Sequence, residues 1–461
     1  MLEPLTFAEV AAVTGGKLEG IDGSLTFNTV STDTRTIEAG ALFIALKGEN
    51  FDGHSYVPQA LAKGALAVVV STPIEGTPCI EVSDTLAALQ AIARLSREKF
   101  TGPVVGVTGS VGKTTTKDLL ALALSPLGPV HKTPANLNNE IGVPLTILTA
   151  PPDTKALVLE MGMRGLGQIA ELAMVAKPSV GVITGVGVTH MELLGSKANI
   201  AQAKGELFEA LDASGIAVYP ATDEFAAELK AKSKAPSLTI ALDAEADIRA
   251  TNLKFTAGSW DAEVTGPWEG AVPLHVPSPG RFNVQNALLA IAVATHLGVD
   301  PQAAAKAIEG YQPGSGSMRL ETLVATSGAT VLSDCYNAAP DSMSGALETL
   351  MQTEPGEGGK RIAVLGEMRE LGEYADEGHA LVGRAIAKLK PEMLVLVGAE
   401  KMRKMSAAAI AGGFPLDNIH YFDSSGQATA GIKFIVQNGD VVLVKGSRGV
   451  AMESIVEALV S

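Results

Sequence analysis

Short apolar runs alternate with helical patterns from the start of the chain. The runs LFIAL (42–46) and ALAVVV (65–70) precede a helical pattern at residues 84–100. Short apolar runs bounded by turn residues predict buried strands, whereas apolar residues spaced by three or four predict helices. The Gly and Pro of TGPVV (101–105) then interrupt the pattern. These features predict a first α/β domain at residues 1–99.

The alternation continues to the other end of the chain. Continuous runs at 104–108 (VVGVT), 156–160 (ALVLE) and 180–184 (VGVIT) predict buried parallel strands with crossover helices. The Gly- and Ser-rich stretch 311–318 indicates a linker, and three further runs follow it, RIAVLG, MLVLVG and VVLVKG. We therefore expect three α/β domains, at residues 1–99, 100–313 and 314–461.

The overall charge indicates which classes of molecule the protein is expected to bind. The 461 residues include 46% hydrophobic and 18% charged residues, and the formal net charge is −15. Nucleic acids and anionic membranes bind clustered Lys and Arg, so neither is expected as a partner. Acidic ligands in local basic pockets are still compatible with this charge.

The two cysteines and the first residues of the chain indicate the cellular compartment in which the protein is expected to work. Cys79 and Cys335 are far apart and lack metal-ligand spacing, so neither a disulfide framework nor a zinc site is expected. The start of the chain lacks the basic and apolar segments of a signal peptide. No window approaches the roughly 18 apolar residues of a spanning helix. We expect a cytoplasmic protein that does not insert into a membrane.

The stretch GVTGSVGKTTTKD (106–118) has the context of a phosphate-binding loop. An apolar strand precedes it and a helical pattern follows. Gly109 and Gly112 allow backbone N–H groups to face anionic oxygens, and the helix N-terminus adds its positive dipole end. Lys113 is expected to hold the β- and γ-phosphates, and the Thr114 hydroxyl to bind Mg²⁺. A glycine-rich turn with a chance lysine is the alternative.

Two further residues follow apolar strands in the central domain. Glu160 ends the run ALVLE, at the sheet edge where α/β proteins place their chemistry, and it would supply a second oxygen ligand for Mg²⁺. His190 follows the run at 180–184 in the same way. From the sequence alone, His190 is either a ligand or a structural histidine.

Lys204 falls on an apolar helix stripe. In a helix over residues 197–213 it shares a face with Ile200, Leu207, Phe208 and Leu211. Burial would lower the lysine pKa and free its amine to react. The alternative is a lysine whose ammonium extends to solvent. Because the guanine-reading Asn-Lys-x-Asp motif is absent, these residues indicate an ATP- and Mg²⁺-dependent phosphoryl-transfer enzyme with an unknown acceptor.

Glycines at 106, 109 and 112 followed by Lys-Thr-Thr resemble the phosphate loop of the Mur ligase superfamily. The resemblance extends over nearly the whole chain. It implies a UDP-sugar-binding domain, a central P-loop ATPase domain on a parallel sheet, and a C-terminal Rossmann-like domain. It also implies an ATP-dependent ligase that activates a carboxylate as an acyl phosphate. The motifs below are most similar to the branch that joins D-alanyl-D-alanine to UDP-N-acetylmuramoyl-tripeptide in peptidoglycan precursor synthesis.

Several segments resemble the superfamily's substrate-binding segments. STDTR (31–35) and ALKGENFDGH (45–54) imply uridine diphosphate contacts, and TPANLNNEIGVP (133–144) implies contacts to the rest of the substrate. Without the resemblance, these segments would be an ST-turn, a hairpin loop and asparagine turns. The implied substrate-binding residues are Ser31, Thr32, Lys47, Gly48, Asn136, Asn138 and Asn139.

Other segments resemble the nucleotide and catalytic segments. AKGELF matches the superfamily's catalytic lysine segment, so Lys204 is implied to carry a carbamate that binds or orients Mg²⁺ together with Thr114, Glu160 and His190. RFNVQNALLA (281–290) implies adenine contacts, and Asp334 a ribose contact. The nucleotide-binding residues so implied are Gly109, Ser110, Val111, Gly112, Lys113, Thr114, Thr115, Asn283, Asn286, Arg319 and Asp334. Lys113, Lys204, His190 and Arg319 are the implied catalytic residues.

The resemblance also covers the expected reaction partners. The loops LGEMRELGE (365–373) and VKGSRGVAME (444–453) are implied to line the dipeptide site of a monomeric enzyme. The alternatives are a ligase of the same superfamily that uses UDP-N-acetylmuramoyl-dipeptide or folate, and a nucleotide-switched binding protein without ligase chemistry.

Three positions depart from the superfamily pattern. Phe282 replaces a histidine, Thr184-Gly185 replaces Thr-Asn, and Ala339 stands where Asn or Ser is usual. Ala339 precedes Pro340, the expected first residue of a helix, so the lost N-cap side chain should cost about 1 kcal/mol.

Overall fold

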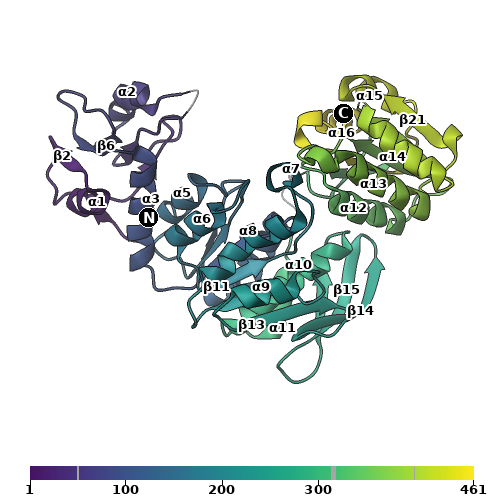
Figure 1. Ribbon diagram of the computed structural model, residues 1–461, viewed down its shortest axis with the longest axis horizontal. Coiled ribbons are helices and arrows are strands. Elements are labelled where there is room, and N and C mark those ends of the chain that lie inside the picture. The colour runs from purple at the N-terminus through teal and green to yellow at the C-terminus, as the bar shows by residue number, and fades with distance from the viewer. Residues whose placement is uncertain (49–50, 313–317, 399) are drawn as a thin grey trace.

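The protein has three lobes arranged in a row along its longest axis, with the central lobe between the other two (Figure 1). The computed structural model describes residues 1–48, 51–312, 318–398 and 400–461. Each lobe is built on its own main sheet, of five, nine and six strands in chain order. The expected linker at 311–318 and the expected boundary after residue 313 fall largely outside the described residues.

The N-terminal lobe contains a mostly parallel sheet of order β2-β7-β6-β5-β4. The strands β4, β5, β6 and β7 are parallel, and β2 pairs antiparallel with β7. Asp84 caps the last helix by accepting hydrogen bonds from two backbone N–H groups. The elements are β1 Leu5–Thr6, α1 Phe7–Thr14, β2 Lys17–Glu19, β3 Thr26–Phe27, β4 Val30–Ser31, β5 Leu42–Ile44, η1 Gly53–Tyr56, α2 Val57–Ala62, β6 Ala67–Val70, β7 Cys79–Glu81 and α3 Thr85–Lys99.

The central lobe has a nine-stranded sheet of order β16-β15-β14-β13-β12-β11-β8-β10-β9. The strands that end at the phosphate loop, at Glu160 and before His190 are neighbours: β8 lies between β10 and β11. The elements are β8 Val104–Thr108, α4 Lys113–Ala123, η2 Ser125–Leu127, β9 Val130–Lys132, α5 Gly142–Leu148, β10 Ala156–Glu160, α6 Gln168–Ala176, β11 Val180–Ile183, α7 Met191–Leu194, α8 Lys197–Glu209, β12 Ile216–Pro220, α9 Ala226–Lys232, β13 Ser237–Leu242, β14 Ile248–Thr256, β15 Ser259–Thr265, β16 Val272–Val276, α10 Arg281–His296 and α11 Pro301–Ile308.

The predicted parallel strands are confirmed, and the sheet extends beyond them. β8 and β10 occupy the residues of two of the three predicted runs, and all five residues of each strand are buried. The strands from β9 to β14 are parallel, whereas β14, β15 and β16 pair antiparallel. Buried and exposed residues alternate along β15, as in a sheet with one solvated face. This antiparallel extension was not predicted.

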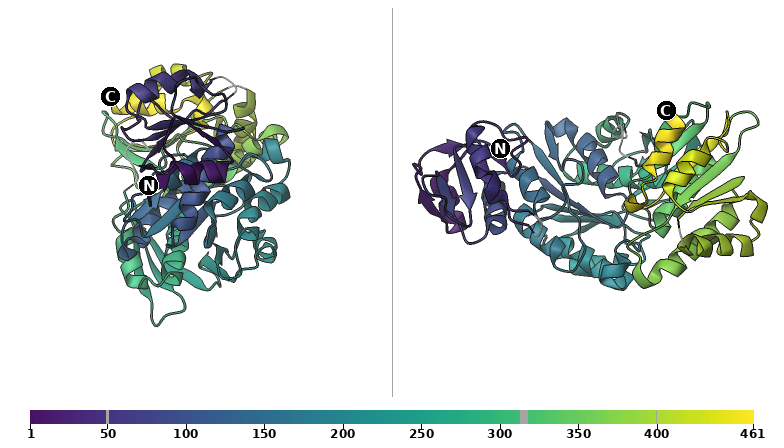
Figure 2. Two further views of the ribbon diagram at one scale, coloured as in Figure 1. Left: turned by 90° about the vertical axis from the view of Figure 1, so that its left-hand side faces the viewer. Right: turned by 90° about the horizontal axis from the view of Figure 1, so that it is seen from above.

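The C-terminal lobe contains a sheet of order β17-β18-β22-β19-β20-β21, in which only β17 is antiparallel to its neighbour. Figure 2 shows this lobe at the opposite end of the molecule from the N-terminal lobe. The elements are β17 Glu321–Val324, β18 Thr330–Asp334, α12 Pro340–Gln352, β19 Arg361–Gly366, η3 Gly372–Tyr374, α13 Ala375–Leu389, β20 Met393–Val397, α14 Glu400–Ala411, η4 Leu416–Asn418, β21 Ile419–Phe422, α15 Ser425–Ile432, β22 Val441–Lys445, η5 Arg448–Val450 and α16 Glu453–Val460.

Two packing features matter for the site. The helix α3 packs against α5 and α6, and so joins the N-terminal lobe to the central lobe. The carboxyl ends of β18 and β22 carry Asp334 and Lys445, and both residues line a cavity against the central lobe.

Within the described ranges, no helix has both the length and the apolar character needed to cross a bilayer.

Candidate active site

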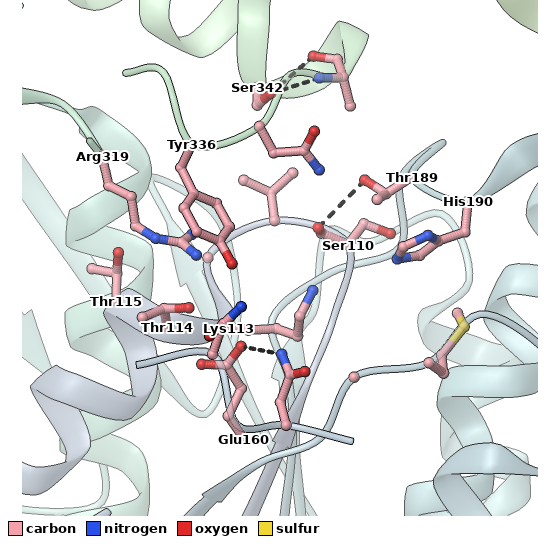
Figure 3. A pocket seen from close by; sticks show the side chains of 18 of the residues that line it. Ser110, Lys113, Thr114, Thr115, Glu160, Thr189, His190, Arg319, Tyr336 and Ser342 are labelled. Atoms are coloured by element: carbon pink, nitrogen blue, oxygen red, sulfur yellow. Dashed lines mark hydrogen bonds between the residues drawn. The ribbon is translucent and has the colours of Figure 1, made fainter. Parts of the chain in front are cut away.

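A cavity of about 840 Å³ lies where the central and C-terminal lobes meet. Figure 3 shows that Arg319, Tyr336 and Ser342 approach from the C-terminal lobe, opposite the phosphate loop and Glu160. The residues predicted from sequence that line this cavity are Ser110, Val111, Gly112, Lys113, Thr114, Thr115, Asn136, Asn138, Asn139, Glu160, His190, Asn283, Arg319 and Asp334.

The phosphate loop requires glycine at two positions. Gly109 and Gly112 have φ of +150° and +89°, in the region that favours glycine. A Cβ atom on Gly112 would lie 2.6 Å from Oδ1 of Asn286, and one on Gly109 would overlap the Thr184 hydroxyl. The helix α4 starts directly after the loop, at Lys113. Its first N–H groups therefore face the cavity, as anion binding requires.

The loop that follows β11 supports the phosphate loop. Ser110 donates its backbone N–H to the Gly185 carbonyl at 2.9 Å, and its hydroxyl accepts the Gly187 N–H at 2.8 Å. The Thr184 hydroxyl donates to the Val111 carbonyl. The Thr184-Gly185 departure from the superfamily pattern is thus accommodated: both residues bond to the phosphate loop.

Lys113 lies between opposing charges. Its Nζ donates to the Gly109 carbonyl at 2.7 Å. Burial lowers the pKa of Lys113; the Glu160 carboxylate acts against this effect, and the Arg319 charge adds to it. A bound polyphosphate would supply the negative charge that this group of cations lacks.

Glu160 is buried at the end of β10, and one of its carboxylate oxygens has no hydrogen-bond partner among the described residues. Its Oε1 accepts a hydrogen bond from Nδ2 of Asn138 at 2.8 Å, and its backbone N–H donates to the Thr133 hydroxyl at 2.9 Å. Only 2% of Glu160 is exposed, and Oε2 has no hydrogen-bond partner among the described residues. Buried polar atoms without partners are uncommon, and a metal ligand is one explanation.

Lys204 is buried in α8, as the stripe pattern predicted. It is 1% exposed, so its ammonium does not extend to solvent. Burial lowers its pKa well below the usual lysine value, and the charge of Lys113 lowers it further. Lys204 does not line the cavity.

His190 contacts the C-terminal lobe. It is the residue before α7, with φ of +67°, and its Nδ1 lies 3.3 Å from Oε2 of Glu370. The pKa of the Glu370 carboxyl is lowered, chiefly by this histidine. Both residues line the cavity, so the pair joins the two lobes at its wall.

Two pairs of side chains order the C-terminal wall of the cavity. The guanidinium of Arg319 lies over the ring of Tyr336, 3.9 Å from its centroid. Asp334 accepts a hydrogen bond from Nζ of Lys445 at 2.6 Å, and Lys445 also donates to the Asn337 carbonyl at 2.9 Å. Lys445 is 2% exposed, so this ion pair is largely screened from water.

The two asparagines of α10 lie at different depths. Asn283 lines the cavity and donates to the Ser278 hydroxyl at 2.6 Å. Asn286 donates to Oδ1 of Asn283 at 3.1 Å and lies behind the phosphate loop, without lining the cavity. Phe282, which replaces the usual histidine, packs against Gly345 of α12 and so contributes to the contact between lobes.

The N-terminal lobe holds a separate group of predicted residues. Ser31 ends β4, and Lys47 follows the neighbouring parallel strand β5, so both lie at the same edge of the sheet. The Ser31 hydroxyl accepts the Asp33 N–H at 3.1 Å, which forms a local turn. Residues 49 and 50 of the predicted segment lie outside the described residues. The separate group consists of Ser31, Thr32, Lys47 and Gly48.

Sequence reasoning missed four residues at or beneath the cavity. Glu370 lies in the segment 365–373, and Tyr336 lies two residues after Asp334, but neither residue was assigned a role. Lys445 directly follows the buried strand run VVLV, and Lys117 lies one helical turn after Lys113. A charged residue after a buried strand, or one turn beyond a catalytic lysine, is the signal that could have identified these two lysines.

The chain matches the family models of the Mur ligases along most of its length. The Mur ligase family catalytic domain matches residues 26–97, the Mur ligase middle domain 107–294, and the Mur ligase glutamate ligase domain 318–448. The relative from Synechocystis named UDP-N-acetylmuramoyl-tripeptide–D-alanyl-D-alanine ligase is 39% identical, over 94% of this chain and 92% of the relative. The Escherichia coli protein of that name is 33% identical, over 99% and 98%.

Solved structures agree with these relatives. A crystal structure of MurF from Acinetobacter baumannii superposes with a TM-score of 0.89 at 30% identity, covering 99% of each chain. The MurF ligase from Thermotoga maritima in complex with ADP has a TM-score of 0.80 at 28% identity, covering 94% of this chain and 97% of the other. The chain therefore belongs to the Mur ligase family, among the MurF ligases.

Proposed function

We propose that the protein is an ATP-dependent ligase that joins D-alanyl-D-alanine to UDP-N-acetylmuramoyl-tripeptide in peptidoglycan precursor synthesis. The observation that carries the proposal is the cavity between two lobes, in which Lys113, Glu160 and Arg319 face one space. The near full-length relatives named for this reaction favour it over the ligases that use the dipeptide or folate.

The first step activates the tripeptide carboxylate. A carboxylate oxygen attacks the γ-phosphorus of ATP, the bond from that phosphorus to the β,γ-bridging oxygen breaks, and ADP leaves with the electron pair. The product is an acyl phosphate. Lys113 and Arg319 approach the transferred group from opposite lobes and offset its charge.

The second step forms the amide. The uncharged amine of D-alanyl-D-alanine attacks the acyl carbon, the bond from that carbon to the phosphate oxygen breaks, and inorganic phosphate leaves with the electron pair. The proton released from nitrogen passes to phosphate or solvent. The loops that carry Glu370 and Lys445 reach the cavity from the C-terminal lobe, and we assign the dipeptide to that side.

The residues present fit a magnesium ion. Oε2 of Glu160, which accepts no hydrogen bond from the described residues, is a hard oxygen ligand, and Thr114 and His190 line the same cavity. The lowered pKa of Lys204 supports carbamate formation there, because addition of CO₂ requires the uncharged amine. Thr114, Glu160, His190 and a carbamylated Lys204 would hold Mg²⁺, which would offset negative charge on the phosphoryl oxygens.

The remaining assignments concern binding. In this proposal Asn283 and Asn286 are the adenine-binding pair, with Asn283 lining the cavity and Asn286 hydrogen-bonded behind it, and Asp334 binds the ribose. The asparagine segment Asn136, Asn138 and Asn139 contacts the tripeptide end, and Ser31, Thr32, Lys47 and Gly48 bind the uridine diphosphate. The domains are residues 1–99, 100–313 and 314–461, and the enzyme is a monomer. Both cysteines are buried free thiols, which supports a reducing cytoplasm.

Phosphate release with separate acceptors tests this function. Purified enzyme with ATP and Mg²⁺ should release phosphate and form an amide product when given UDP-N-acetylmuramoyl-tripeptide and D-alanyl-D-alanine. UDP-N-acetylmuramoyl-dipeptide with an amino acid, and folate with glutamate, serve as competing pairs, and Lys113→Met controls for contaminating ATPases. Product with a competing pair alone, or slow hydrolysis that no muropeptide changes, would overturn the proposal.

A further inference from the structure

Lys117 is a buried lysine that the reaction above does not use. It lies one turn beyond Lys113 on α4 and is 2% exposed. Burying an ammonium is costly unless polar or charged groups compensate it. The groups that compensate it therefore show what the residue does.

Three elements meet at the Lys117 ammonium. Nζ donates to the Ala135 carbonyl at 3.3 Å, and it lies 3.7 Å from Oε2 of Glu160 and 3.8 Å from Oδ1 of Asp118. Ala135 belongs to the segment 133–144, which carries the three asparagines and is called the asparagine segment here, and Glu160 ends β10. Apart from Asp118 on its own helix, the described groups that face the Lys117 ammonium thus lie next to the proposed metal and tripeptide sites.

The Glu160 carboxylate is held from two sides. Asn138 donates to Oε1 at 2.8 Å, and the Lys117 ammonium faces Oε2. The Thr133 hydroxyl accepts the backbone N–H of Glu160, so the carboxylate and its backbone both contact the segment that starts at Thr133. The 3.7 Å ion pair is longer than a hydrogen bond, but its attraction in a buried setting favours the carboxylate orientation in which Oε2 faces Lys117.

The Ala135 backbone is in a conformation that needs support. Its φ is +46°, which is uncommon for a residue other than glycine and costs on the order of 1 kcal/mol or more. Lys117 binds the carbonyl of this residue, one position before Asn136. The lysine therefore stabilises the turn that presents the asparagines to the cavity.

We propose that Lys117 is a positioning residue that fixes Glu160 and the asparagine segment relative to the phosphate helix α4. One ammonium sets the position of the metal-binding carboxylate and of the tripeptide-binding turn, with Lys113 four residues away on the same helix. The inference rests on the proposed roles of Glu160 and of the asparagines.

The test compares Lys117→Met with Lys132→Met. Lys132 pairs with Asp118 at 2.6 Å and is half-exposed, and no contact joins it to Glu160 in the part of the chain that the structure describes. The two variants thus remove a lysine next to the same aspartate, and only one of them contacts the metal ligand. Lys117→Gln, which keeps a polar head group, is the second variant in case the methionine variant folds poorly.

Three measurements address the two positioned groups. For Lys117→Met we expect Mn²⁺ affinity, measured by calorimetry with a non-hydrolysable ATP analogue, to fall about 10-fold or more, as for other partners of metal ligands. The Mg²⁺ concentration for half-maximal activity should rise by a similar factor. Amide hydrogen exchange across residues 133–142 should accelerate. Metal-free ADP affinity should change by less than about twofold, because Lys117 does not line the cavity.

The experiments distinguish failure of the Lys117 proposal from failure of the proposed metal site. Tighter metal binding in Lys117→Met would show that the ammonium competes with the metal, and unchanged metal binding and exchange would make it a structural residue; either result overturns the proposal. Glu160→Gln separates this failure from failure of the proposed function. If Glu160→Gln binds Mn²⁺ normally, the ligand assignment is wrong. If Glu160→Gln weakens binding while Lys117→Met does not, only the role of Lys117 is wrong.

Discussion

His379 is a fully buried histidine whose two ring nitrogens are both hydrogen-bonded. Nδ1 donates to the Ala375 carbonyl at 2.7 Å, and Nε2 accepts the Met368 N–H at 3.1 Å. This arrangement requires the neutral ring, because a protonated Nε2 could not accept. Met368 lies two residues before Glu370, so neutral His379 holds the loop that brings Glu370 to the cavity.

Stability should fall at acidic pH through His379. Burial lowers its pKa below the ordinary value of 6.5, so the unfolded chain binds a proton near that pH and the folded chain does not. The contribution is fully present above pH 6.5 and is lost progressively as the pH falls from 6.5 through the lower pKa of the folded state, with a slope of at most about 1.4 kcal/mol per pH unit for one proton. We expect the free energy of unfolding of the C-terminal lobe to fall less steeply between pH 7.5 and 5.5 in His379→Gln.

The matched control for this measurement is His420→Gln. His420 lies on β21 of the same lobe and is only partly buried. Denaturant unfolding followed in the C-terminal lobe at several pH values gives the slopes. Equal slopes in the wild type and His379→Gln would contradict the prediction.

The helix α12 begins without a side-chain cap. Ala339 occupies the N-cap position with extended backbone angles, and Pro340 is the first helical residue, as the sequence predicted. The Ser342 hydroxyl accepts the Ala339 N–H at 3.0 Å and donates to the Ala339 carbonyl at 2.9 Å. The hydroxyl thus satisfies the N–H before the helix, and no side chain at 339 accepts a bond from the first turn.

Restoring the cap should stabilise the helix. Ala339→Ser places an acceptor where the N–H groups of the first turn have none, and we expect the C-terminal lobe to gain about 1 kcal/mol in free energy of unfolding. Ser342→Ala should lose about 1 kcal/mol, because it leaves the Ala339 N–H without its acceptor. Urea unfolding measures both. A neutral or destabilising Ala339→Ser would show that the Ser342 bonds exclude a second capping group.

The central strands of the two larger sheets could be predicted from the sequence because they are continuous apolar runs. β8, β10 and β19 are buried along nearly all of their length, and local composition alone indicates such segments. The antiparallel β14–β16 could not be found in this way, because one face is solvated and polar residues interrupt the apolar pattern. Which face of such a strand is buried depends on the elements that pack against the sheet.

Among the described residues, the contact between the central and C-terminal lobes includes polar pairs, an aromatic ring and the packing of α7 against η3. Besides His190 and Glu370, Oδ2 of Asp341 accepts the Val188 N–H at 3.4 Å. Phe282 packs against α12 at the same contact. The proposed reaction needs these two lobes closed around ATP before chemistry.

Arg319 reaches the proposed phosphoryl-transfer site from a different lobe than the phosphate loop. It is carried by the C-terminal lobe, whereas the phosphate loop belongs to the central lobe and the proposed uridine site to the N-terminal lobe. Arg319→Ala should therefore bind the UDP substrate within about twofold of the wild type but turn over about 100-fold more slowly, through loss of one charge on the transferred phosphoryl group.

Separate measurements of substrate binding and turnover check this prediction. Arg384→Ala removes an arginine of the same lobe that pairs with Glu377 and does not line the cavity, and it should behave as the wild type. Unchanged turnover in Arg319→Ala would remove Arg319 from the mechanism. Loss of UDP-substrate affinity would show that the lobes are coupled before ATP acts.

Much of the candidate site was visible in local patterns. The glycines, Lys113 and Thr114 lie within one short motif, and Glu160 directly follows a buried strand. The burial of Lys204 followed from helical spacing, and the structure confirms it. In contrast, nothing local indicates that Asp334 pairs with Lys445, or that His190 contacts Glu370 across the lobes.

The sequence by itself determined the elements and the chemical character of single residues, because hydrophobic periodicity and glycine spacing act over a few residues. Only the tertiary structure decided which distant residues share a space. Lys117 meets Glu160 because β10 lies beside β8 in the sheet, and Arg319 meets the phosphate loop because one lobe packs over another. Strand order and the placement of the lobes depend on how much apolar surface the whole chain buries. A short stretch of sequence therefore cannot determine them.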